Sequence, residues 1–501
     1  MAPHKRSRTG CWTCREAGYK CDEQKPWCGR CMRLKITCQG YGIKLKWQDD
    51  GASTSNKPPQ KARKNQIRRS EPTSSPSSTL SISSTPTMIS SPQDLLSSSD
   101  SVRNMDRLPN TLQSTYGLSP ADRWLLHYWI DQLSTLISVA PKHNGMAPFQ
   151  LHLTSMAYES PALRSTILSM AAAHMSSASG DVTLSIQAHR HERDAIRELQ
   201  HMIRAPTKVE MEPALATVMM MQVSARLFGD DDEASVANHL MGAKAMIAHF
   251  GKGSQPTSSR IRFLMSLFAY HDILSSVSRG APPLINHESD FAAVEGERDM
   301  QSIAKVLLIV ARISELQDRI RQRRVGTEEA ALNEEEDAIG RELQQRLLAM
   351  DFTCSTTTAT VNGSDISCTA EAYRHAAFIY LYRTWLDIGA PNRISVDHVK
   401  RCLQYIERVE VSSPVTSAHV WPLFTAGCEA IDEEQRDFVR NRFGAMYTLK
   451  RFPSLKRVMR DIEDVWVAKD LEQQMKGQDG MAKVDCIQVI LKRRGREVDL
   501  A

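Results

Sequence analysis

Beyond about residue 116, apolar residues recur along the chain with the spacing of α-helices. They fall at positions i, i+3, i+4 and i+7, whereas the alternation of apolar and polar residues typical of strands is rare. The clearest stretches are Ala121–Ile137, Ala162–Ser176, Ile303–Arg321 and Leu455–Leu471. Helix breakers divide the pattern at Pro141, Pro148, Pro161, Gly251–Gly253, Pro282–Pro283 and Pro422. The sequence therefore predicts a large all-α domain over residues 116–501.

Residues 48–115 lack this pattern and contain no aromatic residue. Ser, Thr and Pro dominate, so the segment cannot bury enough apolar surface to offset the entropy of ordering it, and we expect a disordered linker. Its basic run Lys61–Arg69 is a candidate nuclear-import signal or an extra DNA-contacting arm, with an ordinary charged linker as the alternative. No sustained heptad repeat occurs here, so the C-terminal domain is the better candidate for a homodimer interface.

Residues 1–47 hold a repeated cysteine pattern. The spacing C-x2-C-x6-C occurs twice, 17 residues apart, at Cys11, Cys14, Cys21, Cys28, Cys31 and Cys38. Disulfides would need an oxidising compartment. The first ten residues are basic but lack the apolar core of a signal peptide, and no stretch reaches the roughly 18 apolar residues of a membrane span. We therefore expect reduced thiols in the cytosol or nucleus, and a metal site.

The number of cysteines bears on the number of metal ions. A structural zinc ion takes four ligands in a tetrahedron and tolerates a shell of thiolates. One zinc ion would leave two of the six cysteines idle, as in a single-zinc knuckle with two spare thiols. Two zinc ions need eight ligand positions, which six cysteines supply only if two of them bridge. The internal repeat favours the two-metal cluster.

The pattern resembles the six-cysteine binuclear zinc cluster of fungal transcription regulators. The residues that carry the resemblance are Cys11-Trp-Thr-Cys14-Arg15, Lys20-Cys21-Asp22-Glu23, Pro26, Cys28-Gly-Arg-Cys31 and Cys38. It implies two zinc ions bridged by Cys11 and Cys28. It also implies that Cys14 and Cys21 complete one tetrahedron, while Cys31 and Cys38 complete the other. In this family the C-terminal end of the short helix that follows the first C-x2-C pair enters the major groove of DNA.

The chain departs from the family pattern on that helix, where the family usually carries C-R-x-[RK]-K-x-K-C. Arg15 and Lys20 are kept, but Ala17 and Gly18 stand at the two central basic positions. Neither side chain can donate to a base edge, although one good pair discriminates between bases by about 1–3 kcal/mol. Gly18 is instead expected as a helix C-cap. The module would then read bases through backbone groups and Tyr19, read other bases, or read weakly.

Charge is distributed unevenly along the chain. Residues 1–69 contain 17 Lys and Arg against five Asp and Glu, whereas the remainder has a formal charge of −7. With six thiolates and two zinc ions, residues 1–47 would keep a charge of about +6, which suits an electrostatic contact with a duplex. The predicted DNA-contacting residues are Arg15, Tyr19, Lys20, Lys25, Arg30, Arg33 and Lys35.

The C-terminal region has a resemblance of its own. Segments Ser160–Leu163, Phe263–Ile285 and Trp421–Cys428 are similar to the second type of fungal-specific transcription factor domain, as in regulators of the acriflavine-sensitivity-control kind. The resemblance implies a regulatory helical domain that controls activation and senses a metabolite, and it implies no catalytic residues. No G-x-S-x-G, P-loop, H-E-x-x-H or G-x-G-x-x-G motif occurs.

Other chemically suggestive groups are interpreted as structural. His189 and His191 alternate on a polar helix and face two directions, and Asp230–Asp232 is expected to be a solvated loop. Met219–Met221 is expected in a core helix. The remaining cysteines lack the spacing of metal ligands: Cys354, Cys368, Cys402, Cys428 and Cys486.

The sequence thus predicts a small zinc-stapled module of two short helices (1–47), a disordered linker (48–115) and an all-α regulatory domain (116–501). We expect a nuclear, non-enzymatic regulator of RNA polymerase II genes that controls a metabolic or secondary-metabolite gene set. Its expected partners are double-stranded DNA and the transcription machinery or co-regulators; a small-molecule effector and a homodimer are further candidates. The alternatives are a nuclear interaction protein whose zinc module has lost base reading, and an enzyme with a zinc-stapled appendage.

Overall fold

A computed structural model describes residues 11–38 and 118–500 with internal gaps. The gaps are residues 18, 23, 25–27, 35, 37, 141, 143–144, 205–210, 230–235, 251–257, 287–300, 327–330, 353–360, 496–497 and 499. The chain divides into two compact units, Met1–Leu95 and Leu96–Ala501. The predicted linker 48–115, with both of its boundaries and the run Lys61–Arg69, lies outside the described residues, as do Asp230–Asp232 and Cys354.

The N-terminal unit contains two short helices, α1 (Trp12–Glu16) and α2 (Gly29–Arg33). Each begins directly after the first cysteine of one sequence repeat, so the duplicated spacing is also a duplicated fold. The resemblance implied a helix after the first C-x2-C pair, but α1 contains Cys14, because Cys11 caps it. The prediction of a small cysteine-rich module with two short helices is confirmed.

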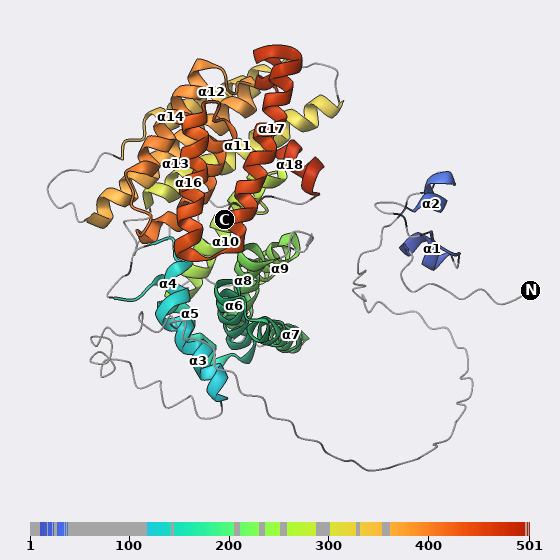
Figure 1. The fold of residues 1–501 in the computed structure, drawn as a ribbon, viewed down its shortest axis with the longest axis vertical. Coiled ribbons are helices and arrows are strands. Elements are labelled where there is room, and N and C mark those ends of the chain that lie inside the picture. Colours follow the sequence, from blue (N-terminus) through green and yellow to red (C-terminus); the bar gives the residue numbers. More distant parts are fainter. Residues whose placement is uncertain are drawn as a thin grey trace, which may run out of the picture. The chain divides into compact units, whose positions relative to one another are not determined.

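The C-terminal unit is built from helices, drawn in cyan to red in Figure 1, and no β-strand occurs among its described residues. Its first half comprises α3 (Pro120–Tyr128), the π-helical turn η3 (Trp129–Leu133), α4 (Ser134–Leu136), α5 (Pro148–Glu159), α6 (Pro161–Ser179), α7 (Val182–Arg204), α8 (Met211–Phe228), α9 (Val236–Phe250) and α10 (Ser259–Arg279). Its second half comprises α11 (Gln301–Gly326), α12 (Glu334–Leu348), α13 (Val361–Leu386), α14 (Arg393–Glu407), the 3-10 turn η5 (Pro414–His419), α15 (Val420–Cys428), α16 (Glu433–Lys450), α17 (Pro453–Ala482) and α18 (Cys486–Arg494).

Local sequence accounts for where many of these helices start and stop. Helix α6 begins with Ser160, whose hydroxyl accepts a hydrogen bond from the backbone N–H of Leu163 at 3.4 Å, and with Pro161 in its first turn. It ends at Gly180, whose φ of 74° is the left-handed conformation that glycine adopts without a Cβ clash. Helix α12 begins with a reciprocal capping box between Asn333 and Glu336.

Two helices organise the core of this domain. Helix α6 packs against α3, α5, α7 and α8, and α13 packs against α11, α12, α14 and α15. Helix α10 joins the two groups, since it contacts α5 and α8 as well as α11 (Figure 1). The largest fully buried side chains include Trp129, Phe268, Tyr373 and Trp421. A single cluster of buried residues runs from Leu125 to Leu500, so the two groups share one hydrophobic core.

The all-α prediction is confirmed, and all four predicted stretches lie within or across helices. Pro148 and Pro161 mark helix starts, but Pro422 does not break the pattern. It lies in the first turn of α15, where its missing N–H would have no intrahelical partner. The Met219–Met221 stretch is buried in α8, as expected. Among the described helices, none has both the length and the apolar content needed to cross a membrane.

Candidate metal centre and nucleic-acid interface

The two cysteine repeats fold in the same way. Cys11 precedes α1 and its sulfur accepts a hydrogen bond from the backbone N–H of Cys14 at 3.4 Å. Cys28 precedes α2 and its sulfur accepts the backbone N–H of Cys31 at 3.3 Å. Each helix therefore carries one cysteine at its N-cap and one inside its first turn, which turns both sulfurs to the same side.

Both helices also end alike. The N–H of Tyr19 donates to the carbonyl of Cys14 at 2.9 Å, and the N–H of Ile36 donates to the carbonyl of Cys31 at 3.1 Å. These six-residue closures are typical of the Schellman motif. Ala17 is the C-cap residue of α1. Gly18, which the sequence predicts to end this helix in the left-handed conformation, follows it and lies outside the described residues.

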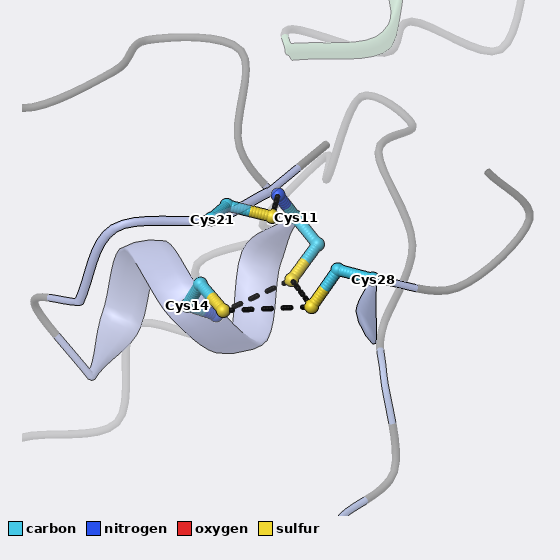
Figure 2. Close-up of side chains that lie close together, drawn as sticks. All are labelled: Cys11, Cys14, Cys21 and Cys28. Atoms are coloured by element: carbon cyan, nitrogen blue, oxygen red, sulfur yellow. Dashed lines mark hydrogen bonds between the residues drawn. The ribbon is translucent and has the colours of Figure 1, made fainter. Parts of the chain in front are cut away.

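The six sulfur atoms form two overlapping groups of four. One group contains Cys11, Cys14, Cys21 and Cys28, the other contains Cys11, Cys28, Cys31 and Cys38, and within each group all sulfurs lie within 4.8 Å of one another. Figure 2 shows the sulfurs of the first group, with Cys11, Cys14 and Cys28 turned toward one another. Cys11 and Cys28 belong to both groups, and their sulfurs are 3.6 Å apart.

The separations between sulfurs fit zinc. Four thiolates at about 2.3 Å from a tetrahedral zinc ion lie about 3.8 Å from one another. The sulfur of Cys28 lies 3.7 Å from that of Cys14, and the sulfur of Cys11 lies 3.9 Å from that of Cys31. Five of the six cysteines are buried and Cys38 is half-buried. Desolvation raises the pKa of Cys28 to about 12, so this thiol needs a bound cation in order to lose its proton at neutral pH.

The carboxylate of Asp22 connects the loop after Cys21 to the start of α2. In the sequence this residue stood out only as part of the family motif. Asp22 accepts hydrogen bonds from the backbone N–H groups of Gly29, at 3.0 Å, and Arg30, at 2.9 Å. It thus satisfies two donors at the start of α2 from the loop that follows Cys21. A Cβ atom on Gly29 would come within 2.7 Å of an Asp22 oxygen, so glycine permits this contact. Sequence spacing alone does not reveal that the two elements meet.

The predicted DNA-contacting residues differ in exposure. The exposed ones are Arg15, Tyr19, Lys20 and Arg33, whereas Arg30 is half-buried and Lys25 and Lys35 lie outside the described residues. The Arg30 guanidinium stacks over the Tyr19 ring, with its carbon 3.9 Å from the ring centre, and one of its nitrogens lies 3.8 Å from the sulfur of Cys14. Arg30 therefore has partners inside the module, next to the cluster.

The described histidines and cysteines of the helical domain that were interpreted as structural do not converge on a common point as the six N-terminal cysteines do. His191 contacts Asp122 at 3.2 Å and His189 is exposed. Cys402 and Cys428 are buried and Cys368 and Cys486 are half-buried. Among the described residues, the two sulfur groups are the only sets of three or more His, Cys, Asp or Glu side chains that converge closely enough to hold a metal ion.

Comparison with known families agrees with this geometry. The profile of the "Fungal Zn(2)-Cys(6) binuclear cluster domain" matches residues 9–48, and that of the "Fungal specific transcription factor domain" matches residues 124–500, most of the chain. The chain belongs to the fungal specific transcription factor domain family. Both resemblances drawn from the sequence are thereby confirmed. The zinc-cluster match implies zinc binding and a DNA-binding role.

Several curated proteins are similar to a short part of this chain. The pestheic acid cluster transcriptional regulator 3 of Pestalotiopsis fici is 59% identical over 46 residues, which is 9% of this chain and 8% of that protein. The arginine metabolism regulation protein II of Saccharomyces cerevisiae is 54% identical over 39 residues, 8% of this chain and 4% of that protein. The ustiloxin B cluster transcription factor ustR of Aspergillus flavus is 43% identical over 51 residues, 10% of this chain and 9% of that protein.

The chain thus covers less than a tenth of the length of each of these family relatives. No solved structure matches the chain. The comparisons therefore link this protein to transcription regulators through its domains, and the architecture of the helical domain is described from its own residues.

Proposed function

We propose that this protein is a zinc-dependent, sequence-specific DNA-binding regulator of RNA polymerase II genes that acts in the nucleus. The observation that carries the proposal is the pair of four-sulfur groups that share Cys11 and Cys28, on a module with exposed basic side chains. No catalytic role is assigned to the helical domain, which belongs to a family of transcription factor domains.

The cluster is proposed to hold two zinc ions. Cys11 and Cys28 bridge them, and the overlap of the two sulfur groups supports this assignment. The first ion is completed by Cys14 and Cys21, and the second by Cys31 and Cys38. Bound zinc supplies the folding free energy and a fixed frame, while the protein residues hold the sulfurs through backbone N–H groups and orient α1.

The DNA-binding face is proposed to comprise Arg15, Tyr19, Lys20, Lys25, Arg30, Arg33 and Lys35. Lys20 follows the end of α1 and is exposed, which suits a phosphate contact. The stacking of Arg30 on Tyr19 holds the Tyr19 ring beside the same end of α1. Ala17 at the C-cap is exposed but carries no donor, so base reading falls to Tyr19 and to the neighbouring Arg15.

The regulated genes are proposed to form a metabolic or secondary-metabolite set. The names of two relatives refer to the pestheic acid and ustiloxin B clusters, and that of a third refers to arginine metabolism. The helical domain is proposed to receive a small-molecule signal and to contact the transcription machinery or co-regulators. A homodimer, if one forms, is proposed to use this domain.

The deciding experiment is selection of duplexes from a random pool by the full-length, zinc-loaded chain. We expect an enriched motif, and two zinc ions per chain by native mass spectrometry. A Cys28→Ser variant should enrich nothing, whereas Cys368→Ser, which alters a half-buried thiol of the helical domain, should enrich the same motif.

One observation favours a second candidate, a nuclear interaction protein whose zinc module no longer reads bases. The exposed C-cap position that family members fill with a basic residue is Ala17 here. Retention of duplexes without enrichment, with a steep loss of binding as salt rises, would favour this second function over the first.

A further inference from the structure

A cavity of about 170 Å³ lies inside the helical domain, where the two helix groups meet. Its walls come from α5, α8 and α10 on one side and from α11, α16 and the start of α17 on the other. Most of the lining side chains are apolar, among them Phe149, Leu227, Phe263, Leu307 and Met446. A small apolar molecule would therefore be well matched to most of the surface of this cavity.

One charged side chain lines the cavity among the described residues. Lys450, the last residue of α16, is 4% exposed. Its ammonium donates to the hydroxyl of Ser417 at 2.7 Å and to the carbonyl of Leu136 at 3.4 Å. An ammonium has three donors, and these neutral oxygens accept two of them. Burial lowers the pKa of Lys450 to about 8, so it still carries its charge at neutral pH.

A second buried lysine shows what Lys450 lacks. Lys469 on α17 is fully buried, and its ammonium lies 2.6 Å from a carboxylate oxygen of Glu429. That pair is compensated inside the protein, as buried charges usually are. None of the described residues that line the cavity is an Asp or a Glu. The positive charge at the cavity wall is therefore left for an anion that the fold does not itself supply.

Two residues of α10 that line the same cavity, His271 and Ser266, each contain a buried polar atom without a partner. His271 is 4% exposed, and its Nδ1 atom has no hydrogen-bond partner among the described residues; the same holds for the hydroxyl of Ser266. Burial, and then the nearby charge of Arg226, lower the pKa of His271 to about 3, so the ring is neutral. The neutral ring adds no charge to the cavity wall, so Lys450 is the charged group that a ligand would meet among the described lining residues.

We propose that this cavity binds a small, largely apolar monocarboxylic acid. Its carboxylate pairs with the Lys450 ammonium, and its body packs against the apolar walls. The role of this ligand as an effector of transcription rests on the proposed function. Its binding to the helical domain does not rest on that function, because DNA takes no part in the binding.

The test is calorimetric titration of the full-length, zinc-loaded chain with naphthoate and with decanoate, each beside its neutral amide. The amides match the acids in shape and lack only the charge. We expect at least one acid to bind at least about tenfold more tightly than its amide, because a charged hydrogen-bonded pair forms only with the acid. Lys450→Met should abolish this preference and leave amide binding. Lys456→Met, at an exposed lysine beside Tyr447, should leave the preference unchanged.

A second variant covers the case in which Lys450→Met fails to fold. Ala304→Phe places a ring in the cavity from α11, well away from Lys450 in sequence, and should abolish binding of acid and amide alike. Equal affinity for acid and amide, no binding of either acid to the natural chain, or binding that survives in Ala304→Phe would each overturn the proposal. A chain that selects no DNA motif but prefers the acid would overturn the proposed function and leave this inference standing.

Discussion

The two units of this protein are held together by different means. Among the described residues of the N-terminal module, the buried cluster consists of cysteines, while Tyr19, Met32, Leu34 and Ile36 are exposed. In the C-terminal domain, one continuous core runs from Leu125 to Leu500. A module this small cannot bury enough apolar surface to fold by itself, and metal coordination takes the place of a core.

Because one unit depends on metal and the other on a hydrophobic core, each should unfold independently of the other. A change that removes metal should unfold one unit and leave the other, and a change in the hydrophobic core should do the reverse.

The largest effect is expected from Cys28→Ser. It removes a sulfur that belongs to both four-sulfur groups, and a structural zinc contributes about 10–16 kcal/mol to folding in finger peptides. The variant should lose both zinc ions in native mass spectrometry and lose DNA binding. The calorimetric unfolding transition of the helical domain should stay where it is. A variant that kept two zinc ions and its fold would show that the bridging assignment is wrong.

The converse change is Phe268→Ala in the helical domain. Phe268 on α10 is fully buried, so its truncation should lower the unfolding free energy of this domain by about 3–5 kcal/mol. The zinc content of the module should remain at the value of the natural chain. Met475→Ala, at a side chain that is 75% exposed, is the control and should change the urea midpoint little. Equal midpoints for the two variants would contradict the core described here.

Acid should weaken the helical domain through buried histidines. Burial is the main reason that the pKa values of His271 and His419 are about 3, and nearby cations (Arg226 for the first, Arg442 and Lys450 for the second) add to it. Between these values and the ordinary 6.5, the unfolded chain binds more protons, so stability falls as pH drops below about 6.5. We expect a loss of about 1.4 kcal/mol per pH unit for each histidine.

Urea unfolding between pH 7.5 and pH 5.5, followed by helical circular dichroism, measures this slope. Replacing His419 with Gln should reduce the dependence of the unfolding free energy on pH by about 1.4 kcal/mol per pH unit. His189→Gln, at an exposed residue of α7, should not alter the slope. An unchanged slope in His419→Gln would show that His419 is protonated in the folded domain.

The smallest effect is expected from Lys20→Ala in the module. As a phosphate contact, Lys20 should contribute similarly to every duplex, so binding should weaken about equally across sequences and the salt dependence should fall by about one counterion. Lys20→Arg keeps the positive charge and should bind DNA as tightly as the natural chain does. Titration of the selected duplex and of a scrambled one at several salt concentrations separates the two roles. A loss confined to one base position would instead make Lys20 a base-reading residue.

The local elements could be predicted from sequence because they depend on neighbours in the chain. Helical spacing is a short-range pattern, and it placed the helices around Trp124, Ile167 and Val458 correctly. The convergence of the cysteines could be predicted as well, because the helix caps at Cys11 and Cys28 place cysteines that are close in sequence side by side. Pro422 was misjudged because a proline's effect depends on its position within a helix.

The sequence by itself determined a cysteine-rich basic module followed by an all-α domain, since thiol spacing, charge and helical periodicity are local properties. Only the tertiary structure decided which distant groups meet. Asp22 meets the start of α2, and Arg30 lies on Tyr19. Lys450 lines a cavity together with residues as distant in the chain as Ile137. Nothing in the sequence around Lys450 indicates that it is buried without an acid, because burial depends on the packing of helices from the whole domain.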